Sequence, residues 1–198
     1  MEPEKSVLEL ASSLARAAGA IQRERYATAL EIRTKSAAVD LVTEVDESCE
    51  ALIVSTLQAE RPGDAILAEE GGETDRDGAS WRWIIDPLDG TTNYAHGYPR
   101  FCVSIGVEFE GVRTVGVVYD PLMDELFHAV GGRGAYLNGR PIHVSKETVL
   151  DRSLLATGFA YDRNRLADTN FDNLVEIGMR SRGLRRMGAA ALDLAYVA

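Results

Sequence analysis

Cysteine is scarce in this 198-residue chain, which contains only Cys49 and Cys102. The two lie far apart, form no C-x-x-C pair and stand in apolar runs, where a free cysteine behaves as a small hydrophobic side chain. This usage argues against an oxidising compartment. We therefore expect reduced thiols and a cytoplasmic protein.

Long apolar runs and basic charge are also lacking. No apolar run approaches the roughly 18 residues that a membrane-spanning helix needs. The first ten residues, MEPEKSVLEL, lack the basic and apolar regions of a signal peptide. The 21 basic residues are outnumbered by 31 acidic ones, and the formal net charge of -10 disfavours nucleic acid as a partner. We expect a soluble protein with no membrane or nucleic-acid partner.

The composition is otherwise that of an ordinary globular protein, 45% hydrophobic and 26% charged, with enough apolar content for a core. Apolar residues recur at intervals of three and four positions from Val7 to Ile21, which predicts an amphipathic helix to about Tyr26. A second helix is expected from near Asp46 to just before Arg61.

From Ala65 the apolar pieces become short, rich in β-branched residues and separated by Gly or Asp, which predicts strands, several of them in a meander. Asn138-Gly139 is expected to form a hairpin turn, because Asn-Gly favours a primed turn. The expected strands are AILAE (65–69), WRWIID (81–86), FCVSIGVEFEG (101–111), RTVGVVYDP (113–121), DELFHAVGG (124–132) and GAYLNG (134–139).

The pattern changes again after about residue 149. We divide the chain into residues 1–149, an α+β part expected to bind metal and phosphate, and residues 150–198, the start of a second αβα part. No C-cap signal follows the last helical segment, so we expect a chain cut short within a helix. The elements expected in the second part are a strand at SLLATG (153–158), a helix over 168–180, an extended piece at RGLRRM (182–187) and a helix beginning over 188–198.

The most informative stretch is WRWIIDPLDGTTNYAHG, residues 81–97. An apolar strand reaches Asp86, and Pro87, which has no N–H and a fixed φ, is expected to end its pairing. Asp86 and Asp89 can then converge on one side of a turn together with the Leu88 carbonyl. Two carboxylates held together repel unless a cation removes the cost. Oxygen ligands of this kind suit Mg²⁺ first, and Mn²⁺ or Ca²⁺ next.

The residues that follow these acids suit an anion. If Gly90, Thr91 and Thr92 open a helical turn, their N–H groups form a nest for phosphate oxygens. Asp-Pro and Asp-Gly are also ordinary turn sequences, but the whole string D-P-x-D-G-T-T after a strand is much rarer than either. The stretch therefore predicts a site that binds a cation and a phosphate together.

Three further residues are weaker candidates when each is taken alone. Glu69, followed by Glu70 and two glycines, fits a solvated loop as well as a metal site. Asp46 fits a helix N-cap. Lys35 by itself is no more than an exposed lysine.

Taken together, however, these segments resemble the inositol monophosphatase family, within the lithium-sensitive, magnesium-dependent phosphatase superfamily. The resemblance covers essentially the whole chain. The segments that carry it are Lys35 with DLVTEVD (40–46), AEEGG (68–72), WIIDPLDGTTNYAHG (83–97), VGVVYDP (115–121), GRGAYLNG (132–139) and RRMGAAALDLAYVA (185–198).

The resemblance implies an α+β fold layered as an αβαβα sandwich, here with its last layers incomplete, and a cytoplasmic homodimer. It implies hydrolysis of myo-inositol monophosphate or a related sugar phosphate by metal-activated water. Two or three Mg²⁺ ions are implied, with Mn²⁺ as a possible substitute and Li⁺ and Ca²⁺ as inhibitors. Paired cations can activate water and stabilise the leaving oxygen, so no covalent nucleophile is required.

Individual roles follow from the same resemblance. Thr91 would orient the attacking water with Glu69 and pair with Asp46, while the N–H groups of Gly90 and Thr91 would bind phosphate oxygens. The implied metal ligands are Glu69, Asp86, the Leu88 carbonyl, Asp89 and, through water, Asp46. The implied substrate contacts are Glu69, Leu88, Asp89, Gly90, Thr91, Arg186, Gly188, Ala189 and Ala190. Lys35 is a further candidate site residue without an assigned role.

Two departures from the family pattern affect these expectations. Ala189 stands where the family commonly has a hydroxyl residue, which removes a polar contact beside the substrate ring. The 198 residues also contain no counterpart of the family's Trp-Asp motif, whose aspartate binds the second metal, or of a substrate-binding Glu. We therefore expect impaired turnover by this chain.

Several alternatives stay open. The motifs bind phosphate and metal rather than the rest of the substrate, so they equally fit an archaeal-type fructose bisphosphatase, a histidinol phosphatase or a phosphoadenosine phosphate phosphatase. A non-catalytic regulatory or binding protein on the same fold is an alternative of another class.

Overall fold

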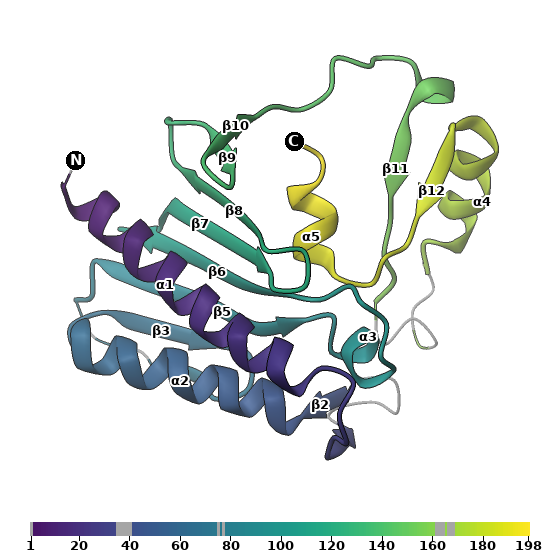
Figure 1. Cartoon of the computed structure of the whole chain (residues 1–198). Coiled ribbons are helices and arrows are strands. Elements are labelled where there is room, and N and C mark those ends of the chain that lie inside the picture. The colour runs from purple at the N-terminus through teal and green to yellow at the C-terminus, as the bar shows by residue number, and fades with distance from the viewer. Residues whose placement is uncertain (1, 35–40, 75, 77, 161–164, 166–168) are drawn as a thin grey trace.

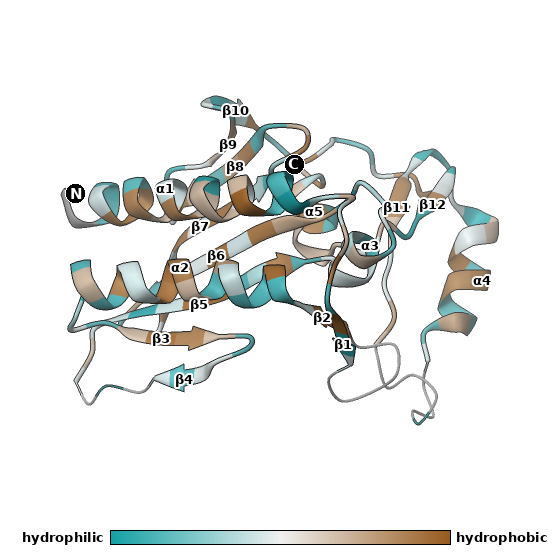
Figure 2. Cartoon of the chain, turned by 60° about the horizontal axis from the view of Figure 1, so that its bottom comes forward, coloured by the Kyte–Doolittle hydropathy of each residue, from teal (hydrophilic) through white to brown (hydrophobic). Residues whose placement is uncertain are grey.

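The computed structural model describes residues 2–34, 41–74, 76, 78–160, 165 and 169–198 (Figure 1). It confirms the α+β class: a large mixed sheet lies against two long helices, α1 (Glu2–Arg25) and α2 (Glu44–Glu60). The helices run side by side across one face of the sheet (Figure 2). Within the described ranges, no helix has both the length and the apolar character needed to cross a membrane.

The large sheet has eight strands in the order β10-β9-β8-β7-β6-β5-β3-β4. Among the described strands of this sheet, β3 and β5 are the only parallel pair, and the six strands from β5 to β10 form the predicted antiparallel meander. The strands are β3 (Ala65–Ala68), β4 (Gly72–Thr74), β5 (Trp81–Asp89), β6 (Cys102–Phe109), β7 (Val112–Asp120), β8 (Glu125–Val130), β9 (Ala135–Leu137) and β10 (Arg140–Ile142).

The hairpin between β9 and β10 is formed as predicted. Asn138 and Gly139 have φ angles of 48° and 76°, the left-handed values that a primed turn requires at both central residues. The Asn138 side chain also accepts a hydrogen bond from the Leu126 N–H at 2.9 Å, which ties the turn to β8.

The core lies between the helix pair and the sheet. Trp83 is fully buried there, and its indole N–H donates to Asp64 Oδ2 at 2.8 Å, which satisfies the ring's one polar group. Cys49 and Cys102 are both buried and free. The helix side of the core is built from Val7, Ala11, Leu14, Ala15 and Ala18 of α1 and from Val45, Cys49, Ile53 and Leu57 of α2.

The last fifty residues form smaller elements at one end of the sheet. The two short strands β11 and β12 pair in parallel, and α4 lies beside them with no buried residue (Figure 1). The helix α5 packs Leu192 against Cys102 and Phe127, on the sheet face opposite α1 and α2. The elements are the 3₁₀ turn η1 (Leu150–Arg152), β11 (Leu154–Ala156), α4 (Phe171–Arg180), β12 (Gly183–Arg185) and α5 (Ala190–Ala195).

Two expectations for this part need correction. The last helix does not run to residue 198: it ends at Ala195, and Tyr196 and Val197 close it by donating to the Leu192 and Leu194 carbonyls. The helix α4 begins at Phe171, while the predicted start at Asp168 lies outside the described residues. The division at residue 149/150 stays a prediction.

Candidate active site

A cavity of about 240 Å³ opens where the end of β5, the short helix α3 (Thr91–Ala95) and the start of α5 meet. Most of the residues singled out in the sequence lie around it. It is lined by Glu69, Asp86, Leu88, Asp89, Gly90, Thr91, Thr157, Gly158, Phe159, Arg186, Gly188, Ala190 and Asp193.

The strand β5 reaches this cavity through a bulge at Pro87. Pairing with β6 is interrupted after Asp86 and resumes at Asp89, opposite Cys102, so the prediction that Pro87 ends the pairing is wrong. A bulge leaves one residue unpaired, which suits a proline that has no N–H to donate. The Pro87 carbonyl accepts from the buried Gln22 side chain at 2.7 Å. The bulge brings both aspartates to the cavity wall.

Asp86 lies in β5 and Glu69 directly follows the neighbouring parallel strand β3, and their carboxyl groups share a hydrogen bond. Burial raises the pKa of Asp86 well above its ordinary value, and the negative charges of Glu69 and Asp89 raise it further. A buried carboxyl so strongly biased toward its proton is one that a cation would stabilise in its ionised form.

Asp89 interacts with the start of α5. Its two carboxylate oxygens accept from the Ala190 N–H at 3.1 Å and the Ala191 N–H at 2.6 Å, and the Cys102 thiol donates to it at 3.6 Å. Burial raises the pKa of Asp89, and the hydrogen bonds from Ala191 and Ala190 oppose that rise. The carboxylate therefore takes the place of a side-chain cap, which Ala189 cannot supply.

These contacts mean that the three acids do not all converge on one point. The described part of the chain contains no group of three His, Cys, Asp or Glu side chains already gathered in a metal-binding arrangement. The donors nevertheless fit a hard cation, because Glu69, Asp86, Asp89 and the Leu88 carbonyl supply oxygen only. Asp89 would exchange one backbone contact for the cation.

Asp46 lies on the other side of the cavity wall, at the first turn of α2. The N-cap of that helix is Thr43, not Asp46; Asp46 occupies the third helical position and completes a capping box by accepting from the Thr43 N–H at 2.9 Å. Its other oxygen accepts from the Thr91 hydroxyl at 2.9 Å. Burial raises the pKa of Asp46, and hydrogen bonds from Thr43 and Thr91 oppose that rise.

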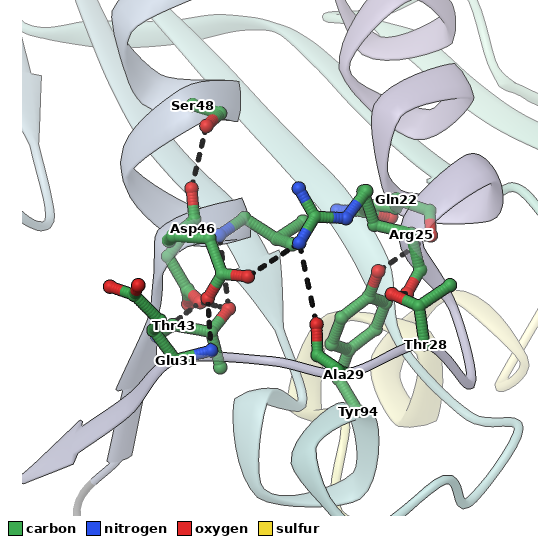
Figure 3. A network of polar contacts seen from close by, with 11 residues as sticks. Gln22, Arg25, Thr28, Ala29, Glu31, Thr43, Asp46, Ser48 and Tyr94 are labelled. Atoms are coloured by element: carbon green, nitrogen blue, oxygen red, sulfur yellow. Dashed lines mark hydrogen bonds and ion pairs between the residues drawn. The ribbon is translucent and has the colours of Figure 1, made fainter.

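Figure 3 shows the network in which Asp46 lies. Tyr94 of α3 donates its hydroxyl to the Gln22 carbonyl at 2.7 Å, and Arg25 donates to Glu44 at 2.6 Å. The ends of α1 and α3 are thus joined to the start of α2, next to the bulge. Thr91 is held between Asp46 and the Leu88 carbonyl, which lies 3.0 Å from its Oγ1.

Gly90 begins α3 in a conformation that only glycine adopts easily, with φ of 97°. A Cβ at this position would also lie 2.9 Å from the Arg100 carbonyl oxygen. Asn93, three residues further on, donates to the Arg100 and Met187 carbonyls, both at 2.7 Å. Asn93 therefore joins α3 to the segment that carries Arg186 and Gly188.

The remaining residues that the sequence predicted for the site do not all line the cavity. Arg186, Gly188 and Ala190 line the cavity, whereas the Ala189 side chain is fully buried in the small cluster with Cys102 and Leu192. Lys35 lies outside the described residues.

Sequence reasoning missed several residues around the cavity. Thr157, Gly158 and Phe159 follow β11 and form part of its wall, and Asp193 of α5 forms another part. Glu50 and Gln22 make buried or half-buried polar contacts to the segments that carry Glu69 and Asp86, and Asn93 makes one to the segment that carries Arg186. Only Asn93 carried a usable sequence signal, because it follows directly on DGTT.

This combination of carboxylates and a Gly-Thr turn at the end of a strand is that of a metal-assisted phosphatase. Residues 4–198 match the sequence model described as the Inositol monophosphatase family, so the chain belongs to that family and is a phosphatase. Inositol-1-monophosphatase of Synechocystis sp. is 47% identical over 96% of this chain and 67% of its own length. Nus factor SuhB of Escherichia coli K12 is 42% identical over 97% of this chain and 72% of its own length.

Solved structures of the family have the same fold. Inositol monophosphatase from Anabaena superposes with a TM-score of 0.85 at 44% identity, covering 98% of this chain and 71% of the other. An IMPase/NADP phosphatase solved with Mg²⁺ and phosphate superposes with a TM-score of 0.81 at 25% identity, covering 96% of this chain and 70% of the other. The chain thus spans about two thirds to three quarters of the length of these relatives.

Proposed function

We propose that this phosphatase is Mg²⁺-dependent and hydrolyses myo-inositol monophosphate or a related sugar phosphate. The observation that carries the proposal is the meeting of Glu69, Asp86 and Asp89 with the N-terminal turn Gly90-Thr91 at one cavity. A phosphate ester needs two things from such a site: oxygen ligands that hold a hard cation, and N–H groups at a helix N-terminus that donate to the anion. A solved relative of the same fold holds Mg²⁺ and phosphate.

The chain's own groups would hold the cation and the ester in place. Glu69, Asp86, Asp89 and the Leu88 carbonyl would be the direct ligands, and Asp46 would act through water. When bound, Mg²⁺ lowers the pKa of water and neutralises charge that develops on the phosphoryl group. The family resemblance implies two or three ions in the complete site, with Mn²⁺ as a substitute and Li⁺ and Ca²⁺ as inhibitors.

The other residues would orient the reactants. The Thr91 hydroxyl, which donates to Asp46, can accept a hydrogen bond from a water beside Glu69, and the Gly90 and Thr91 N–H groups can donate to phosphate oxygens. Arg186, Gly188 and Ala190 also line the cavity, and the alcohol part of the substrate would lie against them. Alignment and fixed charge then supply most of the rate enhancement.

The direct test is phosphate release from myo-inositol monophosphate by the purified chain, with Mg²⁺ and with a chelator. We expect release only with Mg²⁺, and loss of release in Asp86→Asn. Glu60→Gln, at the far end of α2, is the control for a lost carboxylate. Equal release with the chelator would contradict the mechanism.

The rate of this assay also tests whether the chain is impaired. The family's further aspartate ligand has no counterpart among the 198 residues, so we propose slow turnover even at saturating Mg²⁺. A rate in the ordinary range for enzymes, about 1 s⁻¹ or more, would contradict that.

The substrate and the competing class need separate measurements. A panel containing fructose 1,6-bisphosphate, histidinol phosphate and phosphoadenosine phosphate separates the related activities. Calorimetric titration with Mg²⁺ addresses a non-catalytic role: no binding in the millimolar range would favour a protein that keeps the fold as a partner surface.

Assembly and location are further proposals. We propose that the protein is a homodimer. Its molar mass, measured by light scattering as it elutes from a size-exclusion column, tests this. The two buried free thiols support a reducing compartment such as the cytoplasm.

A further inference from the structure

Glu69 lies where β3 ends and a short turn leads to β4. Its N–H still follows the sheet by donating to the Ile85 carbonyl at 3.2 Å. The next residues, Glu70 and Gly71, leave the ladder. Whatever holds this turn therefore determines where the Glu69 carboxylate lies relative to Asp86.

The turn is held by Glu50 of α2. The Glu50 side chain is only 7% exposed, and its Oε2 accepts from the Glu70 N–H at 2.8 Å. A carboxylate that accepts from a backbone N–H makes a stronger hydrogen bond than a neutral group would. This bond connects the helix to the residue directly after Glu69.

Gly71 fits around the same carboxylate. A Cβ at Gly71 would lie 2.8 Å from Glu50 Oε1, and the only other atom near it would be Glu50 Cδ at 3.9 Å. Gly71 is not among the residues with positive φ, so backbone strain does not require glycine there. Close approach of the Glu50 carboxylate does.

Glu50 also shares a helix face with Asp46, because residues four apart lie one above the other. One side of α2 therefore faces two different walls of the cavity, through Asp46 to Thr91 and through Glu50 to the Glu69 turn.

We propose that Glu50 is a positioning residue, which fixes the turn after β3 so that Glu69 faces Asp86 and thereby sets the affinity of the site for a divalent cation. The inference rests on the proposed Mg²⁺-dependent function. Replacing a residue that positions a metal ligand without touching the metal typically lowers metal affinity by about 10- to 100-fold.

The first experiment measures Mg²⁺ binding by calorimetry in Glu50→Leu and Glu50→Gln. We expect Glu50→Leu to weaken binding by about tenfold or more, and Glu50→Gln, which keeps one acceptor oxygen, to weaken it less. Glu60→Gln is the matched control, with the same lost charge on the same helix. Hydrogen exchange at the Glu70 amide should speed up in Glu50→Leu, whether or not metal is present.

The second experiment uses the contact with Gly71. Gly71→Ala should weaken Mg²⁺ binding in the wild-type background, because the new methyl group displaces the Glu50 carboxylate. In a Glu50→Ala background the same change should have little further effect, since the overlapping atom is gone.

The outcomes distinguish the two proposals. Wild-type Mg²⁺ binding that Glu50→Leu leaves unchanged would overturn the role of Glu50 and leave the proposed function intact. Gly71→Ala that is equally harmful in both backgrounds would do the same. A wild-type chain that binds Mg²⁺, but releases phosphate from no substrate, would overturn the proposed function alone. A wild-type chain that binds no Mg²⁺ would overturn both.

Discussion

The Thr91 hydroxyl donates to Asp46 Oδ1 at 2.9 Å and so joins α3 to α2 across 45 positions of sequence. Both residues are buried, and Asp46 is held in turn by the capping box at the start of its helix. The hydroxyl hydrogen therefore has a fixed direction, and the oxygen keeps its lone pairs for a further donor at the cavity. This pair therefore fixes one polar group of the proposed active site.

Thr91→Val should lower the rate of phosphate release by roughly 100-fold, because a misplaced reactant costs about that much. The new side chain has nearly the same shape, so packing is preserved while the hydroxyl is lost. Thr91→Ser keeps the hydroxyl and should retain most of the activity. The measurement is release at saturating Mg²⁺ and substrate, and equal rates in the Val and Ser variants would contradict the orienting role.

Gly90→Ala should destabilise the fold more than Gly97→Ala does. Both glycines have positive φ, 97° and 67°, but a Cβ at Gly97 meets no atom within 4 Å. Gly97→Ala should therefore cost about 1–2 kcal/mol from backbone strain alone. Gly90→Ala adds overlap with the Arg100 carbonyl, a further cost of about 1–3 kcal/mol. Urea unfolding of the two variants measures the difference, and equal losses would show that the Arg100 overlap relaxes freely.

The sequence was sufficient for those parts of the site whose chemistry is local. In DPLDGTT the proposed ligands and the proposed anion-binding turn are neighbours in sequence, so their placement at one cavity needs no knowledge of the rest of the fold. The alternating and helical patterns likewise predicted the meander and both long helices, since one face of each is buried in the same core.

The sequence was insufficient where a residue acts through distant contacts. Gln22 reaches Pro87 across 65 positions and Asn93 reaches Met187 across 94, and no spacing rule predicts either pair. The prediction that Pro87 ends the strand pairing was wrong for a related reason. Its missing N–H argues for a strand end unless β6 is seen to resume pairing at Cys102 beyond a bulge.

The metal-free chain should lose stability as the pH rises above about 4. Burial raises the pKa of Asp86 in the folded chain, whereas in the unfolded chain the carboxyl ionises near pH 3.9. The unfolded state therefore releases its proton first as the pH rises, and folding becomes less favourable until the pH passes the raised pKa. Urea midpoints at pH 5 and pH 8 with a chelator measure this.

Asp86→Asn should reduce that loss of stability, because the amide has no proton to release. Added Mg²⁺ should stabilise the wild-type chain more at pH 8 than at pH 5, since the cation competes with the proton for the same carboxylate. If the stability of the wild type and that of Asp86→Asn changed with pH in parallel, Asp86 would be excluded as the source of the pH dependence.

Asn93→Asp should lower the stability of the folded protein more than Asn93→Ala does. The Asn93 amide donates both of its hydrogens, one to the Arg100 carbonyl and one to the Met187 carbonyl. Alanine leaves two carbonyls without this donor, at a cost of about 1–3 kcal/mol. Aspartate adds a carboxylate that faces the same two oxygens and can donate to neither, so repulsion is added to the loss.

The effect should be seen in substrate binding as well as in stability, because Met187 lies between Arg186 and Gly188 on the cavity wall. We expect KM for the phosphate ester to rise in Asn93→Ala while Mg²⁺ affinity changes little, since the proposed metal ligands lie in β5 and directly after β3. Steady-state kinetics and calorimetry on the same sample separate the two quantities. A variant in which Mg²⁺ affinity falls and KM stays constant would place Asn93 with the metal ligands rather than with the substrate wall.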